Sequence, residues 1–457
     1  MTDSDEFIDG LFAQHGTSMP NRVAIVSEDG VWTIADVRRE IEHTAQRLRA
    51  RGFAAGHRIA VSLPAGRAAL ATILGALCSG GIVAPLSRSL GPAARCFRLQ
   101  ELQPDIIVDE DGGRNGDFAI VGRAASTPDV GCLVLWTSGS TGLPKGVVLD
   151  WRGVLWNARA NACELDIRPT DRALILLDPT YCYAFVHQIL SHWIVGGSVA
   201  MPPQPVWLEA TGRLVERFEP TTLAVVPSIL RTLLALPRLH APLGRLRLLT
   251  VGGAAVDEAL LRRAQETLPE VKLVVTYGLT EAGPRVATRF VRRHEDLPAG
   301  TVGRVLPGVD LWVDTEGQIF VRSPSVRVGV LEKGRIRLAP AWVATGDLGE
   351  LGSNGTLRLI GRRRPMINRG GVKIAPGEIE RVLCSDPNVV AARVVAMPHA
   401  RLGEVPKALV VPRPYAVPTI SSLACRCFEQ LGAAWVPVAF EFMQSLPPAP
   451  SGWKEVT

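Results

Sequence analysis

Residues Thr137–Gly146 read TSGSTGLPKG, and the fold can be worked out from this stretch outward. Short apolar runs typical of β-strands flank it, Cys132–Trp136 before it and Val147–Leu149 after it. Its three glycines permit backbone angles closed to other residues and let the main chain approach a ligand closely. Four hydroxyl side chains and Lys145 add donors and a positive charge. The stretch therefore predicts a loop between two strands that binds the phosphates of a nucleotide.

Two other interpretations of this loop compete with the phosphate cradle. The nucleotide loop of P-loop enzymes requires a lysine followed by Ser or Thr at the start of a helix. Here Lys145 follows Pro144, Gly146 comes next, and a strand follows. A solvent-exposed Gly/Ser loop without a ligand is the other alternative, and the completeness of the pattern makes it the weaker one.

The bulk composition is that of a globular protein with more than one domain. The 457 residues exceed what one hydrophobic core organises, and 47% are hydrophobic against 21% charged. The net charge of +6 suits a partner rich in phosphate or carboxylate, but no basic, aromatic-interleaved stretch indicates nucleic-acid binding. The eight cysteines lack a metal-binding spacing, because the pair Cys425 and Cys427 has no second pair, so reduced thiols are expected. The acidic, polar N-terminus does not resemble a signal peptide, and we expect a cytoplasmic protein.

One uncharged stretch, residues 68–87, approaches the length of a membrane-spanning helix. Ser79-Gly80-Gly81 and Pro85 interrupt it. We therefore predict a buried helix, a glycine turn and a short strand there, and no membrane span.

Helical and strand-like patterns alternate along the first 300 residues. Apolar residues recur every three or four positions from Thr33 to Gly52, which predicts an amphipathic helix, and Arg58–Leu63 reads as a strand. Further strands are expected at 173–177, 223–226, 246–251 and 272–275, with a helix at 257–268. The alternation indicates an α/β fold of layered, largely parallel sheets.

From about Gly300 the pattern changes to short strands and glycine turns, which indicates a β-subdomain. The basic stretch GRRRPMINRGG follows at 361–371, and after it a helix at 376–383 and a strand at 389–395 form a compact unit. We therefore expect a large N-terminal domain over residues 1–361 and a small, mobile α+β C-terminal domain over residues 362–457.

TSGSTGLPKG resembles the phosphate-binding signature of the adenylate-forming superfamily, which includes acyl-CoA synthetases, carrier-protein-loading adenylation domains and luciferases. Further segments follow in the order typical of that superfamily: VGGAAV at 251–256, TYGLTEAG at 276–283, TVGRVLPG at 301–308, ATGDLGEL at 344–351 and GRRRPMINRGGVKIAPGEIE at 361–380. The resemblance implies that ATP activates a carboxylic acid as an acyl-adenylate with release of pyrophosphate, and that a thiol then takes the acyl group as a thioester.

The resemblance also implies roles for individual residues. Lys145 and the rest of its loop would hold the β- and γ-phosphates, and Thr280 and Glu281 would meet the α-phosphate. Glu281, with Thr141, would contribute to a Mg²⁺ site. The implied nucleotide contacts are Thr137, Ser138, Gly139, Ser140, Thr141 and Gly142 at the phosphates, Gly252, Gly253, Ala254, Thr276, Tyr277 and Gly278 around the adenine, and Asp347 and Arg362 at the ribose. Outside their motifs, Glu281 would be interpreted as a solvated acid, Asp347 as a turn residue and the Gly252 segment as an ordinary strand-to-helix turn.

Members of the superfamily rotate the small domain between the two half-reactions. Arg364 falls on the hinge position, where Pro365 stiffens the linker. Gly370 and Gly371 resemble the turn that borders the tunnel for the thiol; otherwise they would simply form a tight turn.

The C-terminal end departs from the superfamily pattern, in which a catalytic lysine directly follows a Ser/Thr-Gly pair. Here the end reads SGWK, so Trp453 takes the expected position and Lys454 comes one residue later. Either Lys454 serves adenylation through a shifted backbone, or the lysine is lost and adenylation is slow. We favour the first alternative.

The segment at 176–201 resembles the part of the superfamily that carries the acid pocket. Tyr181, Cys182, Tyr183 and Ser228 are the expected pocket residues, and His187 and His192 are expected to pack on the following helix. Two tyrosines and a cysteine give the pocket polar groups, so an aromatic or short-chain acid is favoured over a long acyl chain.

Three hypotheses about function remain open. The first is an acyl-CoA synthetase, and the second is a stand-alone enzyme that loads a phosphopantetheine carrier protein. Both share every motif up to the thiol acceptor, and a basic surface suits the phosphates of CoA as well as an acidic carrier. The third is a nucleotide-binding protein with impaired catalysis, motivated by Trp453.

Overall fold

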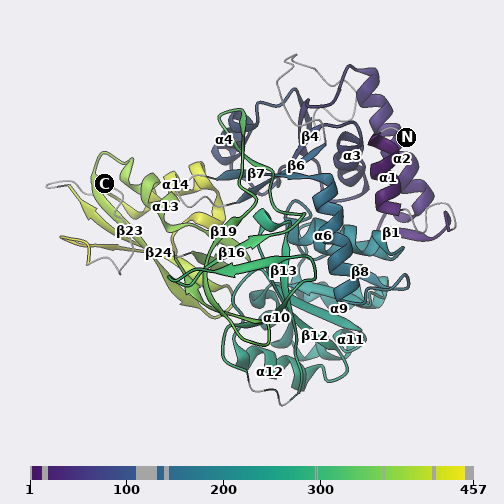
Figure 1. The fold of residues 1–457 in the computed structure, drawn as a ribbon. Coiled ribbons are helices and arrows are strands. Elements are labelled where there is room, and N and C mark those ends of the chain that lie inside the picture. The colour runs from purple at the N-terminus through teal and green to yellow at the C-terminus, as the bar shows by residue number, and fades with distance from the viewer. Residues whose placement is uncertain are drawn as a thin grey trace.

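Three β-sheets with helices packed on them form the part of the chain that the computed structural model describes (Figure 1). That part comprises residues 3–12, 19–109, 131–137, 144–293, 295, 297–363, 366–413 and 418–447. Several residues with predicted roles lie outside it. They are Arg364 at the hinge, Trp453 and Lys454 at the predicted catalytic lysine, and Ser138, Gly139, Ser140, Thr141 and Gly142 in the predicted phosphate loop.

A seven-stranded sheet contains the opening stretch and has the strand order β18-β17-β7-β6-β4-β3-β5. Strands β3 to β6 run parallel, whereas β6 and β7 are antiparallel and pair Thr137 with Lys145. The expected loop between two strands is confirmed by this pairing. The strands are β3 (Arg58–Ser62), β4 (Ile82–Pro85), β5 (Ile106–Asp109), β6 (Cys132–Thr137), β7 (Lys145–Asp150), β17 (Gly329–Glu332) and β18 (Arg335–Leu338).

A thirteen-stranded sheet has the order β15-β16-β19-β20-β14-β13-β12-β11-β10-β8-β9-β1-β2. It is parallel from β12 to β1 and antiparallel beyond. The expectation of largely parallel sheets therefore holds for that run and for the run β6-β4-β3-β5 of the seven-stranded sheet, and the other strands of these two sheets pair antiparallel. The strands are β1 (Val23–Ser27), β2 (Gly30–Thr33), β8 (Arg172–Leu174), β9 (Ser198–Met201), β10 (Thr222–Val225), β11 (Leu248–Gly252), β12 (Lys272–Gly278), β13 (Arg285–Phe290), β14 (Thr301–Val305), β15 (Asp310–Val313), β16 (Gln318–Arg322), β19 (Val343–Leu351) and β20 (Thr356–Arg362).

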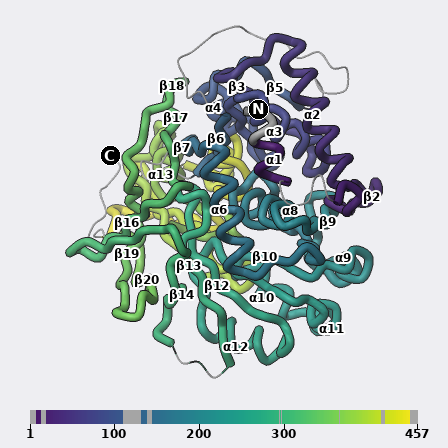
Figure 2. The backbone as a smooth tube through the Cα atoms, turned by 45° about the vertical axis from the view of Figure 1, so that its right-hand side comes forward, coloured from purple at the N-terminus to yellow at the C-terminus, as the bar shows by residue number. Residues whose placement is uncertain are grey.

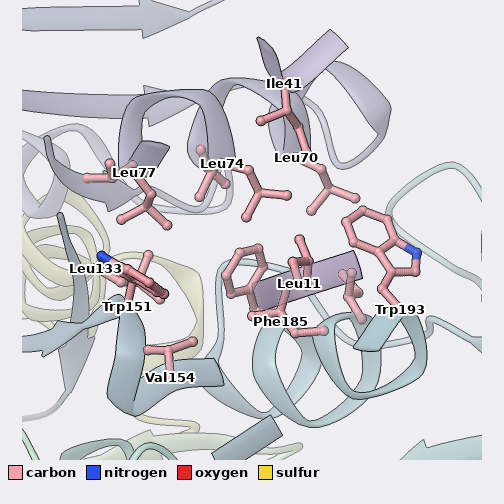
Figure 3. Close-up of a cluster of buried hydrophobic side chains, with 14 of the residues drawn as sticks. Leu11, Ile41, Leu70, Leu74, Leu77, Leu133, Trp151, Val154, Phe185 and Trp193 are labelled. Atoms are coloured by element: carbon pink, nitrogen blue, oxygen red, sulfur yellow. The ribbon is translucent and has the colours of Figure 1, made fainter. Parts of the chain in front are cut away.

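A layer of helices lies between these two sheets, and Figure 3 shows its core. Leu70, Leu74 and Leu77 point from α3 into this core, with Leu77 on the side of Trp151 and Leu70 on the side of Trp193. Each such buried side chain stabilises the fold by about 1.5–3 kcal/mol.

The helices before the small sheet are α1 (Asp3–Phe12), α2 (Ile34–Ala50), α3 (Arg67–Cys78), α4 (Pro92–Leu102), α6 (Trp151–Glu164), α7 (Cys182–Ala184), the π-helix η1 (Phe185–Leu190), α8 (Ser191–Ile194), α9 (Thr211–Phe218), α10 (Pro227–Leu234), α11 (His240–Leu243) and α12 (Glu258–Thr267).

The uncharged stretch at 68–87 forms the expected helix, turn and strand. α3 is buried from Ala69 to Cys78, and β4 follows the Gly80-Gly81 turn. In the described ranges, no helix combines the length and the apolar character needed to cross a bilayer.

A five-stranded sheet near the C-terminal end has a hydrophobic core of its own, drawn from residues 367–431. The backbone of this unit is the yellow-green part of the tube in Figure 2. Its strands are β21 (Ile367–Arg369), β22 (Val372–Ile374), β23 (Val389–His399), β24 (Gly403–Pro412) and β25 (Ala439–Phe442), and its helices are α13 (Pro376–Cys384) and α14 (Ile420–Leu431). The sequence indicated α13 but missed α14. Thr419 caps α14 through the backbone N–H of Ser422, and Leu423, Cys427 and Leu431 form its buried side.

Candidate functional site

The end of β6 and the short 3-10 helix η4 (Thr280–Ala282) bring two predicted groups together. Thr137 Oγ1 lies 3.4 Å from Glu281 Oε1, although the two residues are 144 positions apart. Burial raises the pKa of the Cys182 thiol, and the charge of Glu281 raises it further. Cys182 therefore lies within electrostatic reach of Glu281. One carboxylate beside a phosphate-binding loop fits Mg²⁺, which is typically held by one or two carboxylates together with substrate phosphates.

Asp347 is the centre of the predicted ribose site. The hydroxyl of Tyr277 donates to its Oδ2 at 2.7 Å, and Arg362 Nε donates to its Oδ1 at 2.5 Å. Burial and the charge of Asp347 raise the pKa of Tyr277 far above its ordinary value, so the hydroxyl keeps its proton. β19 and β20 pair Asp347 with Arg362 directly, which explains how residues 15 positions apart share one site.

The predicted adenine segment follows the carboxyl end of β11. A Cβ atom on Gly252 would lie 2.1 Å from Thr276 Oγ1, so only glycine allows β11 and β12 to approach this closely. Gly253 has φ of +78°, which favours glycine as well. Gly278, on β12, would place a Cβ 2.0 Å from Pro284 O. Ala254 is half-buried next to these glycines.

The small sheet contacts this segment through the predicted thiol-tunnel glycines. Asn368 Nδ2 donates to Gly253 O at 3.3 Å, and the backbone N–H of Gly371 donates to Asn368 Oδ1. A Cβ on Gly371, which has φ of +95°, would lie 3.1 Å from Val226 Cγ2. Gly370 lies in the same turn with φ of +61°. The predicted tunnel turn and the predicted adenine segment are therefore neighbours.

The four predicted acid-pocket residues differ in burial and in their hydrogen-bond partners. Tyr183 is half-buried, and its hydroxyl lies 3.3 Å from Thr250 Oγ1 and 3.2 Å from Thr276 Oγ1. Cys182 is buried near Glu281, whereas Tyr181 is 46% exposed. Ser228 is buried on α10, and in the described structure its hydroxyl has no hydrogen-bond partner.

The two histidines of this segment differ. His192 packs as expected, with Nδ1 bonded to Gln188 O at 2.7 Å and Nε2 to Thr222 Oγ1 at 2.8 Å. Burial lowers the pKa of His192 to about 4, so it is neutral. His187 instead stacks near Tyr183, with ring centroids 4.6 Å apart, and contacts Arg285.

Lys373, on β22, is a site residue that the sequence interpretation missed. Burial lowers its pKa, Arg362 lowers it further, and Asp347 and Glu281 act in the opposite direction. Its ammonium group therefore lies within electrostatic reach of the predicted ribose and magnesium residues. The lysine was visible within GGVKIAP, but only the fold brings it beside Glu281.

Comparison with known proteins adds independent findings. A family profile described as AMP-binding enzyme matches residues 12–125 and 121–331, and one described as AMP-binding enzyme C-terminal domain matches residues 378–452. The chain is 28% identical to a sulfoacetate–CoA ligase of Cupriavidus necator, over 97% of this chain and 95% of that protein. It is 28% identical to a fatty acid–[acyl-carrier-protein] ligase of Streptomyces coeruleorubidus, over 96% and 93% of the two chains. A malonyl-CoA ligase solved with methylmalonyl-CoA and AMP bound matches with a TM-score of 0.78 and 26% identity, over 96% of this chain and 100% of that chain.

Proposed function

Because the chain belongs to the AMP-binding enzymes, we propose that it activates a carboxylic acid with ATP and transfers the acyl group to the thiol of CoA. In the first step the carboxylate oxygen attacks the α-phosphorus and pyrophosphate leaves. In the second step the thiol sulfur attacks the acyl carbonyl and AMP leaves. The observation that supports this best is the convergence, at 3.4 Å, of Thr137 at the end of β6 and Glu281 on η4.

The chain's own groups mainly position and neutralise charge in the first step. Lys145 and Thr137 would hold the β- and γ-phosphates, and Thr280 the α-phosphate. Asp347 would accept the two ribose hydroxyls, as a carboxylate with two oxygens can. Mg²⁺, bound at Glu281 with Thr141 nearby, would supply positive charge against the phosphate oxygens.

We propose that residues 362–457 form a lid that moves on residues 1–361 about Arg364. The separate core over 367–431 supports this division. The contact of Asn368 and Gly371 with Gly253 and Val226 suits the thioester step, because it brings the predicted tunnel turn to the predicted adenine segment. The enzyme would work in the cytoplasm on a small acid, aromatic or short-chain.

A phosphopantetheine carrier is the second candidate acceptor, and the similarity to an acyl-carrier-protein ligase favours it specifically. ATP–pyrophosphate exchange over a panel of carboxylic acids tests the first step. Adding CoA, or a carrier protein that bears phosphopantetheine, to the enzyme with ATP and the acid active in exchange then identifies the acceptor. Binding of ATP without exchange for any acid would instead favour a catalytically impaired homologue.

Lys454 is the proposed cation for the attack on the α-phosphorus. Lys454→Ala is expected to slow exchange by at least about 100-fold, the scale of losing one charge-stabilising group in a transition state. An unchanged exchange rate would remove Lys454 from the mechanism.

A further inference from the structure

Arg285 is a buried arginine at the first position of β13, and the proposed reaction has given it no role. It is 2% exposed and lies opposite Gly278 in the β12–β13 register. Asn157 fixes its backbone from both sides: Asn157 Oδ1 accepts from Arg285 N at 3.0 Å, and Asn157 Nδ2 donates to Arg285 O at 3.1 Å. These two bonds fix the backbone from which the buried side chain of Arg285 extends.

The contacts of the guanidinium are polar but uncharged. Arg285 Nη1 donates to Thr288 Oγ1 at 2.9 Å, and Nη2 donates to His187 Nδ1 at 2.5 Å. To accept this bond, His187 must keep Nδ1 unprotonated, and its Nε2 then donates to Thr250 Oγ1 at 3.2 Å. Burial and the charge of Arg285 hold the pKa of His187 well below its usual range, so the imidazole is neutral.

Arg285 forms no salt bridge with any residue that the structure describes, although it feels the charge of Glu164 from beyond salt-bridge distance. Burial lowers its pKa to about 10, which still leaves it charged at neutral pH. Four positions along the same strand, the buried Arg289 binds both oxygens of Glu258, at 2.6 and 3.1 Å. A buried charge without a partner destabilises a protein unless a ligand supplies the opposite charge. Of these two arginines on β13, Arg285 is thus the one suited to an external anion.

The surroundings of Arg285 connect it with the acid rather than with the phosphates. Tyr183, an expected acid-pocket residue, stacks on His187 and bonds to Thr250 and Thr276. Thr280 and Glu281, where the acid would be activated, lie between β12 and β13. An acid that reacts near Thr280 and extends along this hairpin would bring its far end toward Arg285.

We propose that Arg285, with Tyr183 and His187 beside it, binds a second anionic group at the end of the acid remote from the reacting carboxylate. The substrate would then be a dianionic acid whose second group is a carboxylate or a sulfonate. This proposal rests on the proposed function and narrows its substrate class. The planar guanidinium suits two oxygens of such a group, and the neutral hydroxyl and imidazole add hydrogen bonds without competing charge.

Matched acids test the proposal by ATP–pyrophosphate exchange: succinate with butyrate, glutarate with pentanoate, and terephthalate with 4-methylbenzoate. For the skeleton accepted best, kcat/KM of the dianion is expected to exceed that of its monoanionic partner by at least about 100-fold, because a site built for a polar group strongly rejects the analogue without it. Arg285→Met is expected to abolish this preference, because kcat/KM for the dianion falls while kcat/KM for the monoanion stays the same or rises. Arg285→Lys is expected to keep part of the preference for the dianion. Arg337→Met, at an exposed arginine on β18, is the control and is expected to keep all of it.

A thermal unfolding measurement separates recognition from folding. Replacing a buried charge by an apolar side chain of similar volume is often neutral, so Arg285→Met is expected to unfold within about 3 °C of the wild type. A wild type that prefers monoanions, or an Arg285→Met variant that loses both acids of a pair equally, would overturn the proposal and leave the proposed function intact. Absence of exchange with every acid would overturn both.

Discussion

Asp347 is oriented from two sides, by the hydroxyl of Tyr277 and by the guanidinium of Arg362. Its side chain is 7% exposed, whereas that of Arg362 is 32% exposed. The carboxylate therefore needs little rearrangement to accept further hydrogen bonds, and such preorganisation is what strengthens a charged contact with a ligand. The fold thus holds in place the carboxylate that we propose for the ribose.

Removing that carboxylate tests the ribose assignment. Asp347→Ala is expected to raise KM for ATP by roughly 10- to 100-fold, since hydrogen bonds to a charged group contribute about 1.5–3 kcal/mol. Asp310→Ala is the matched control, because Asp310 pairs with Arg322 at 2.7 Å on neighbouring exposed strands. Exchange kinetics at varied ATP measure the effect; equal KM values for the two variants would contradict the assignment.

Lys373 offers a second test at the level of a single residue. Lys373→Met keeps the stem and removes the charge near Asp347 and Glu281, so thioester formation is expected to slow by at least about 10-fold. Lys407→Met is the control on the same sheet, because Lys407 pairs with Glu441 at 2.6 Å on its surface. Single-turnover transfer from a preformed adenylate measures the step, and equal rates in both variants would exclude a role for Lys373.

Motifs in the sequence predicted Asp347, Arg362, Thr137 and Glu281, because a short local pattern surrounds each of them. The structure brings the first two together across paired strands and the last two within 3.4 Å. Arg285 has no such pattern, and Lys373 lies within a quoted segment that gave it no role. Their interest comes from burial and from the charges around them, and both depend on long-range packing that a local pattern does not encode.

At the level of elements, clear periodicity was a reliable guide. α2 begins after the capping residue Thr33 and buries the expected apolar side, and α12 begins after the cap Asp257. α14 was missed because serines and cysteines dilute its apolar repeat, which only three buried residues mark. The π-helix η1 could not be predicted from the apolar pattern. All six of its residues, Phe185–Leu190, are buried, so no apolar and polar sides alternate at a helical period.

The turn at Gly371 gives an element-level prediction. Gly371→Ala introduces a Cβ at positive φ and 3.1 Å from Val226, so the turn must shift away from the adenine segment. The thioester step is expected to slow by about 10-fold or more, while pyrophosphate exchange changes less. Gly355→Ala is the matched control, with φ of +77° and no neighbour within 4 Å of the added Cβ. Equal loss in both variants would assign the effect to backbone strain alone.

At the scale of the whole molecule, α14 of the small unit packs against α4 of the large unit (Figure 1). Gly91 and Gly432 meet there, and a Cβ on Gly91 would lie 3.3 Å from Gly432 Cα. Glu378, on α13, is 1% exposed, and the charges of Arg98 and Arg381 act on it. Burial nevertheless raises the pKa of Glu378 to about 8. The contact therefore favours the protonated acid.

This shifted pKa predicts a pH dependence of stability. A carboxyl group that binds its proton up to about pH 8 when packed, but only to about pH 4.5 when released, destabilises the packed state as pH rises through that window. Glu378→Gln mimics the protonated form, so its melting temperature relative to the wild type is expected to increase from pH 5 to pH 8. Glu429→Gln, at an exposed site on α14, is expected to follow the wild type; a constant difference for Glu378→Gln would refute the buried acid.

The hairpin from β12 to β13 carries both the residues proposed for activation and the arginine proposed for recognition of the acid. Thr280 and Glu281 stand at its turn, and Arg285 follows four residues after Glu281, opposite Gly278. The backbone pairing of β12 with β13 fixes the distance between Glu281 and Arg285, so the hairpin would select acids by length. A molecule one methylene too long must buckle and one too short must leave an end unbound, and selection by length then follows from covalent geometry alone.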